Sequence, residues 1–207
     1  MKKIIVVDYG MGNIHSLSSA IRKLGYLPEI SSSKQEILNA SHLILPGVGE
    51  FQKAMKNLTN LSLDQLIKDC ALKKKVNVLG ICLGMQIMCN SSLEGDSKNK
   101  GLGIINGDVI KLEQKGDYKL PHIGFNEVIF HEGSLYKNNN KVVKDFYFVH
   151  SYCLMDCAME SNAILGLTEY KNKFVSYFQR GNIYATQFHP EKSQTNGLEL
   201  LKLFLQL

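Results

Sequence analysis

Short apolar runs that alternate with helix-sized segments are the feature that most constrains the fold of this chain. The expected strands in the first half lie at 3–8, 27–31, 42–45 and 76–81. The expected helices lie at 13–24, from residue 33, at 51–58 and at 63–72, and Ser33 with Glu36 predicts a capping box at the start of the second. Strands that are apolar along their whole length are buried on both faces, as in parallel sheets joined by right-handed helical crossovers. The first half therefore predicts an α/β fold.

The second half of the chain differs from the first, because it consists mainly of short strand-like runs. They lie at 109–112, 123–130, 146–150, 163–168, 174–178 and 183–188, and residues 197–207 are expected to form a closing helix. These strands are expected to extend the sheet or to pair antiparallel beside it. A chain of 207 residues can bury a substantial core. We therefore predict a single α/β domain over 1–207, with a central mixed, mostly parallel sheet flanked by helices.

Composition limits the classes of function. The net charge of +5 comes from scattered lysine clusters such as 73–75, without the interleaved aromatic residues of a groove for nucleic-acid strands. Five cysteines form no disulfide framework, and Cys153 and Cys157 have no second pair of metal ligands. No run is apolar enough for a signal peptide or a membrane span. The sequence predicts a cytoplasmic protein without nucleic acid, membrane, metal or cofactor.

Cys82 is the strongest candidate for a catalytic residue. It follows an apolar strand and is flanked by glycines in Gly80-Ile81-Cys82-Leu83-Gly84, before an expected helix. This is the pattern of a nucleophile elbow, in which a sharp turn exposes the nucleophile at the carboxyl edge of the sheet. The helix that follows favours a thiolate over a thiol. The alternative is an inert buried cysteine at the end of a strand.

A candidate base for this thiol lies near the other end of the chain. His189, Pro190 and Glu191 follow a strand-like run. In an extended segment, residues two apart lie on the same face, so Glu191 is expected to orient the His189 imidazole. Pro190 places the pair at the end of a strand or on an edge strand. A lone His-Pro is typical of surface loops, whereas its combination with a cysteine elbow favours a catalytic triad.

Two glycine motifs follow strands in the first half. The motif at 8–15 has His15 where a dinucleotide fingerprint has Gly or Ala, which argues against a nucleotide cofactor. The motif at 46–49 lacks the lysine of a phosphate-binding loop. Its amides, together with the amide after Cys82, form a candidate oxyanion hole.

The motifs together closely resemble the class I (triad) glutamine amidotransferases, over essentially the whole chain. GICLGMQ around Cys82 and FHPE at 188–191 are shared by several members that hydrolyse glutamine through a cysteinyl thioester. The remaining motifs are DYGMGN, LPGVGEF, LPHIGFN, YFVHSY and QFHPEKSQ. They are similar to one branch that delivers ammonia to a separate (β/α)8-barrel cyclase. The resemblance implies a flavodoxin-like fold and a heterodimer.

The resemblance also implies roles for individual residues. It makes Cys82 the nucleophile, His189 the general base and acid, and Glu191 the group that orients His189. The oxyanion amides are those of Val48 and Leu83, and the substrate pocket is bordered by Gly49, Gln86, His150, Ser151 and Tyr152. The contacts with the cyclase are expected at Asn13, Tyr147 and Lys192. Two positions depart from the family pattern: Phe125 replaces a usual Trp, and Lys171 stands where Gly is common.

Three other functions are considered. The first is a peptidase or amidase of a related cysteine-elbow superfamily; some of these have His directly after the nucleophile, where this chain has Leu83. The second is a non-catalytic assembly protein of the same fold, which an intact Cys, His and Glu set disfavours. The third is a paralogue that supplies ammonia to a surface-sugar amidotransferase, and the identity of the acceptor protein distinguishes it.

Overall fold

A computed structural model describes residues 2–113, 119–136, 142–155 and 162–207. Its strands are β1 (Ile4–Val7), β2 (Pro28–Ser31), β3 (His42–Leu45), β4 (Asn77–Ile81), β5 (Ser91–Ser92), β6 (Asn99–Lys100), β7 (Asp108–Lys111), β8 (His122–Phe130), β9 (Val142–His150), β10 (Tyr152–Met155), β11 (Ile164–Tyr170), β12 (Asn172–Arg180) and β13 (Ile183–Thr186). Its helices are α1 (Ile14–Lys23), α2 (Lys34–Leu38), α3 (Phe51–Asn60), α4 (Asp64–Leu72), α5 (Leu83–Met88), the 3-10 helix η1 (Pro190–Lys192) and α6 (Gln194–Gln206).

The centre of the sheet is parallel, as predicted. Its strands run in the order β2-β1-β3-β4-β13, and every neighbouring pair among them is parallel. Residues of β1 alternate between two core clusters, with Ile5 and Val7 in one and Ile4 and Val6 in the other. Burial on both faces explains why these strands are apolar along their whole length.

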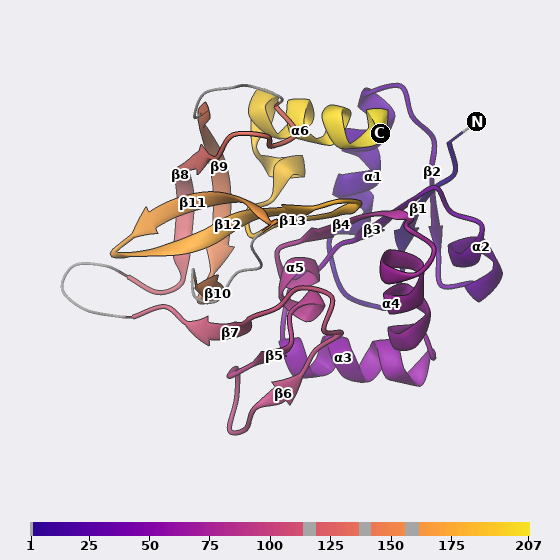
Figure 1. The fold of residues 1–207 in the computed structure, drawn as a ribbon, viewed down its shortest axis with the longest axis horizontal. Helices are drawn as coiled ribbons and strands as arrows, with labels where there is room; N and C mark the ends of the chain where they lie inside the picture. The colour runs from indigo at the N-terminus through magenta and orange to yellow at the C-terminus, as the bar shows by residue number, and fades with distance from the viewer. Residues whose placement is uncertain (1, 114–118, 137–141, 156–161) are drawn as a thin grey trace.

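Helices cover both faces of this parallel centre (Figure 1). The first core cluster includes Ile37 of α2, Leu58 of α3 and Ile67 of α4, whereas the second includes Leu17 of α1 and Phe204 of α6. The helix α5 follows β4 directly and is buried along its whole length. The expected α/β architecture with helices on both sides of the sheet is confirmed.

The second half extends the sheet in an antiparallel manner. β12 pairs with β13, β10 and β11, and the long hairpin of β8 and β9 is joined through β11. β8 alternates between buried and exposed residues, unlike β1, because only one of its faces packs on the core. Figure 1 shows this hairpin standing beside the C-terminal helix α6.

Local geometry corrects one expectation and explains one departure from the family pattern. Ser33 precedes α2, but its side chain makes no capping hydrogen bond, and Glu36 forms an ion pair with Lys3 instead. The expected capping box is therefore wrong. Lys171 connects β11 to β12 with φ of 65°. A positive φ of this size favours glycine, which is the residue that is common in the family here.

Candidate active site

The nucleophile elbow at Cys82 has the geometry that its sequence predicts. Cys82 lies between β4 and α5 with φ of 53° and ψ of −108°, a backbone conformation that L-residues rarely adopt. A Cβ on Gly84 would lie 1.9 Å from the carbonyl oxygen of Leu45, and one on Gly80 would lie 2.5 Å from Met88 Sδ. Both glycines are therefore required by close packing around the turn.

His189 and Glu191 meet as predicted, but the expected geometry is wrong. The imidazole Nδ1 and Glu191 Oε1 are 2.9 Å apart, and the two side chains are 2% and 4% exposed. The residues do not share a face of an extended segment, because β13 ends at Thr186 and Pro190–Lys192 forms a 3-10 helix. Pro190 suits the first position of that helix, since its missing amide hydrogen is not needed there.

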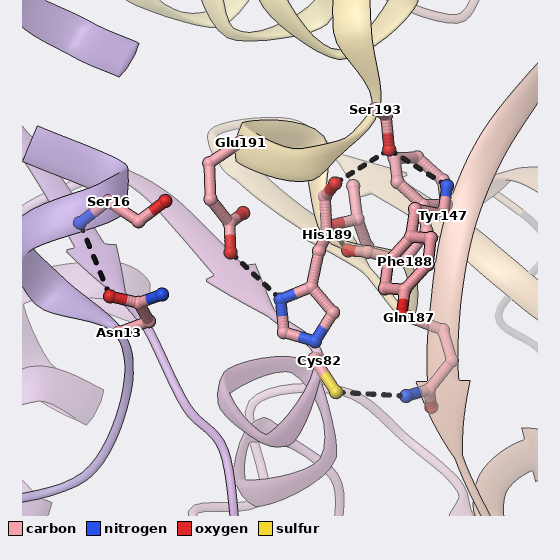
Figure 2. Close-up of polar contacts among 10 residues, drawn as sticks. Asn13, Ser16, Cys82, Tyr147, Gln187, Phe188, His189, Glu191 and Ser193 are labelled. Atoms are coloured by element: carbon pink, nitrogen blue, oxygen red, sulfur yellow. Dashed lines mark hydrogen bonds and ion pairs between the residues drawn. The ribbon is translucent and has the colours of Figure 1, made fainter. Parts of the chain in front are cut away.

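The second nitrogen of His189 faces Cys82 (Figure 2). Apart from its approach to the thiol, the buried Nε2 has no hydrogen-bond partner among the described residues. Burial alone lowers the pKa of this imidazole, but the negative charge of Cys82, a hydrogen bond to Cys82 and the Glu191 carboxylate outweigh it. Together they raise the pKa of His189 to about 10. The site thus favours the imidazolium form of His189.

A cavity of about 450 Å³ opens over the thiol. It is lined by Val48, Gly49, Cys82, Leu83, Gln86, Glu94, Pro121, Val149, His150, Ser151, Tyr152 and Lys192. The lining thus brings together every expected oxyanion and substrate-pocket residue. A larger hollow of about 940 Å³ lies over α3 and α4, away from Cys82. Because only the smaller cavity contains the thiol, it is the candidate active site.

Three residues of the site are not predicted from the sequence. Glu94 lines the cavity, and its Oε2 accepts a hydrogen bond of 2.9 Å from the Phe51 amide. Burial raises the pKa of the Glu94 carboxyl, the Phe51 amide opposes this, and the charge of Glu50 adds to it. Gln187 donates its side-chain amide to the Cys82 sulfur over 3.6 Å.

The third is Tyr9, whose hydroxyl donates to the carbonyl of Pro46 over 2.5 Å. Burial and the charge of Cys82 raise its pKa. Tyr9 and Gln187 lie within the motifs DYGMGN and QFHPEKSQ, but neither motif indicates that these side chains approach the thiol. That proximity comes from the arrangement of the strands.

The three expected partner contacts lie on different elements: Lys192 lines the cavity, Tyr147 is on β9 and Asn13 precedes α1. The backbone of Tyr147 accepts a hydrogen bond of 2.9 Å from the His189 amide and donates one of 2.9 Å to Ser193 Oγ. Lys192 Nζ lies 5.7 Å from the centre of the Tyr147 ring. Asn13 is exposed at the start of α1, where its side chain accepts from the Ser16 amide over 3.3 Å. In Figure 2 Asn13 and Tyr147 lie on opposite sides of the His189–Glu191 pair.

The described ranges contain no group of three His, Cys, Asp or Glu residues arranged to hold a metal ion. Cys157, which together with Cys153 lacks a second pair of metal ligands in the sequence, lies outside the described residues. Within the same ranges, no helix combines the length and the apolar character needed to cross a membrane.

Comparisons with known proteins agree on one family. A family model described as "Glutamine amidotransferase class-I" matches residues 5–207. The chain is 43% identical to "Imidazole glycerol phosphate synthase subunit HisH 1" of Campylobacter jejuni, over 99% of this chain and 100% of the relative. It is 42% identical to "Imidazole glycerol phosphate synthase subunit HisH 2" of Methanococcus maripaludis, over 98% of both chains.

A solved structure of a putative GMP synthase protein from Thermoplasma acidophilum is also similar. It aligns with a TM-score of 0.70 and 23% identity, over 100% of this chain and 93% of the other. At 23% identity, this similarity shows a shared fold only.

Proposed function

Because the chain belongs to the class-I glutamine amidotransferase family, we propose that it is HisH, the glutaminase subunit of imidazole glycerol phosphate synthase in histidine biosynthesis. The observation that carries this proposal is the identity of 42–43% to subunits of that name over nearly the full length of both chains. Residues 1–207 then act as one glutamine amidotransferase domain. The acceptor of the ammonia is a HisF-type (β/α)8-barrel cyclase, which forms a heterodimer with this chain.

The proposed reaction begins with the ion pair of Cys82 and His189. The thiolate attacks the side-chain amide carbon of L-glutamine, and the amides of Val48 and Leu83 hold the oxyanion that forms. His189, oriented by Glu191, protonates the departing ammonia. Water then adds to the thioester with His189 as base, which releases glutamate and restores the thiol. This assignment is supported by the contact between His189 and Glu191 and by the cavity over the thiol.

Charge in the cavity supports an amino-acid substrate. Glu94 and Lys192 both line the cavity, so it offers one carboxylate and one ammonium group. Free glutamine carries both charges on its α-carbon. We assign Glu94 to the α-ammonium group, and Gln86, His150, Ser151 and Tyr152 to the walls around the substrate.

A Glu94→Gln variant is expected to raise the KM for glutamine about tenfold or more while kcat changes little, because it removes a charge-assisted contact made before and during the reaction. The measurement is steady-state glutamate release in the presence of the cyclase. Glu50→Gln is the matched control, since Glu50 lies outside the catalytic cavity, and the KM of this variant should change much less than that of Glu94→Gln. An unchanged KM for Glu94→Gln would remove Glu94 from the substrate site.

The loop at 46–49 is suited to control of the reaction by a partner. Gly49 has φ of 109°, and a Cβ on Gly47 would lie 2.7 Å from Leu83 Cβ and 2.8 Å from the Gly84 amide nitrogen. Glycines let the peptide plane between them turn toward or away from the thiol. One oxyanion donor is typically worth about 3 kcal/mol, so such a turn would change the rate strongly. Asn13, Tyr147 and Lys192 are the proposed contacts that transmit cyclase binding.

The experiment that tests the proposed function measures glutamate release under three conditions. These are the chain alone, the chain with HisF, and the chain with HisF and an analogue of its nucleotide substrate. We expect low activity alone and a stepwise increase with each addition. Full activity of the isolated chain would refute the control by the partner. No stimulation by any HisF would favour the paralogue that serves a surface-sugar amidotransferase.

A further inference from the structure

A chain of buried polar side chains connects the β8–β9 hairpin to the thiol of Cys82. We propose that Gln187 stabilises the Cys82 thiolate by donating a hydrogen bond to its sulfur, and that Gln86, anchored on the Tyr152 carbonyl, orients Gln187 as a donor. The buried pair of His122 and His150 supports this arrangement by holding the same Tyr152 carbonyl in place. The inference rests on the proposed function only in taking Cys82 as the nucleophile. Gln187 is thereby a residue that touches the reacting atom, and the two histidines are positioning residues.

The orientation of Gln187 follows from its neighbours. The carbonyl oxygen of Tyr152 can only accept, so the Gln86 nitrogen that lies 2.8 Å from it must donate. The same nitrogen lies 3.1 Å from Gln187 Oε1, which therefore accepts. Gln187 must then turn its own NH₂ group away from Gln86, and its Nε2 lies 3.6 Å from the Cys82 sulfur (Figure 2). Gln187 is fully buried, so water does not compete for this contact.

The same reasoning assigns the protons on the ring nitrogens of His150 and His122. His150 Nδ1 lies 2.9 Å from the Tyr152 carbonyl and must carry a proton. Burial lowers the pKa of His150 to about 3 and that of His122 to about 4, so both rings are neutral. His150 Nε2 is then an acceptor, and His122 Nδ1 donates to it over 3.1 Å. His122 Nε2 accepts in turn from the Asn126 amide over 3.3 Å.

Ring stacking holds His122, at the far end of this series of hydrogen bonds, in place. The His122 ring is stacked on Tyr170 and on Phe148, with centroid distances of 3.9 Å and 4.8 Å. Because His122 is confined in this way, its Nδ1 proton stays directed at His150 Nε2. His150 and Gln86 both donate to the Tyr152 carbonyl, and Gln86 also donates to Gln187 Oε1, which leaves the Gln187 nitrogen for the sulfur.

The hydrogen bond from Gln187 to the Cys82 sulfur acts differently from the contact between His189 and the same sulfur. A hydrogen bond to the charged form of a group favours that form, and bonds to charged groups are the strong ones. Gln187 does not titrate, so it can donate to the sulfur whenever the thiolate is present, whereas His189 must exchange its proton during the reaction. The charged or titratable groups around the thiol are His189 with Glu191, Tyr9, His150, Glu94 and Lys192.

The test is the rate at which iodoacetamide alkylates Cys82 as a function of pH, read by mass spectrometry of the peptide that contains Cys82. Gln187→Met keeps the length of the side chain and removes the donor. We expect alkylation about tenfold slower near neutral pH, with the rise in rate moved to higher pH. Gln187→Glu should slow it further, because a carboxylate replaces the donor.

Ser176→Ala is the matched control. Ser176 is fully buried on β12 and donates to the Gly166 carbonyl over 3.1 Å, but its side chain is not part of the chain to the thiol. The Ser176→Ala variant should have lower thermal stability but the same pH profile of Cys82 alkylation as the wild type. A folded Gln187→Met variant with the wild-type profile would overturn the proposal.

A second pair of variants tests the histidines independently. His122→Phe keeps the ring stacking and removes the donor to His150, so it should move the profile in the same direction by a smaller amount. His122→Gln restores a donor and should recover most of the wild-type rate. If the pH profile of Cys82 alkylation were the same for His122→Phe and the wild type, the positioning role of the two histidines would be overturned. A shifted profile in a protein that releases no glutamate with any partner would support the hydrogen bond and refute the proposed function.

Discussion

Cys82→Ala is expected to abolish glutaminase activity, with a loss of about ten-thousandfold or more, because the thioester cannot form without the thiolate. Its backbone must still adopt φ of 53°, which alanine tolerates about as well as cysteine, so the fold should survive. The measurement is glutamate release by the variant in complex with the cyclase.

A covalent label distinguishes this prediction from a general loss of structure. A diazo-ketone analogue of glutamine should add one label per chain to the wild type and none to Cys82→Ala. Cys89→Ala is the matched control, since Cys89 is fully buried and burial raises the pKa of its thiol. A label on Cys70 or Cys89 would show that the elbow is not the reactive site.

His189→Ala is expected to lower glutaminase turnover a hundredfold or more, which is the usual effect of removing a general acid and base. The fold should persist because, among the described residues, the side chain makes one hydrogen bond outside the thiol contact, to Glu191. Glu191→Gln should cause a smaller loss, since this residue orients the imidazole and does not exchange a proton with substrate. A larger loss at Glu191, with His189→Ala still active, would contradict the assignment.

The pH dependence of the wild type follows from the same ion pair. The pKa of His189 is raised to about 10, so the imidazolium keeps the proton needed by the departing ammonia up to that pH. Activity should therefore stay level as pH rises through neutrality and fall as pH approaches about 10. A decline centred near the ordinary pKa of histidine would show that the thiolate and Glu191 do not hold this proton.

The sequence predicts the parallel centre of the fold well, because each strand there is buried on both faces and is recognisable from its own residues. β3 matches its predicted range of 42–45, and β1 and β4 differ from theirs by at most one residue at each end. The strand β10 was not predicted. Its residues become a strand because β7 and β12 pair with them from either side, and both partners are distant in the chain.

The site residues also fall into two groups, those predictable from local sequence and those brought in by the fold. Cys82 was predicted because a nucleophile elbow needs glycines at fixed local positions, and Gly84 indeed has no room for a side chain. Glu94 and Gln187 could not be predicted as neighbours of the thiol. Glu94 reaches the cavity from the segment after β5, and Gln187 reaches the Cys82 sulfur because β13 lies next to β4 in the sheet.

The most direct test of the account is the transfer of labelled nitrogen. Glutamine labelled with ¹⁵N in its side-chain amide is given to the complex of this chain with HisF and the nucleotide substrate, in the presence of unlabelled ammonium. We predict that imidazole glycerol phosphate contains the ¹⁵N label, and that Cys82→Ala yields product without it. Product that carries only unlabelled nitrogen with the wild-type chain would contradict the proposed function.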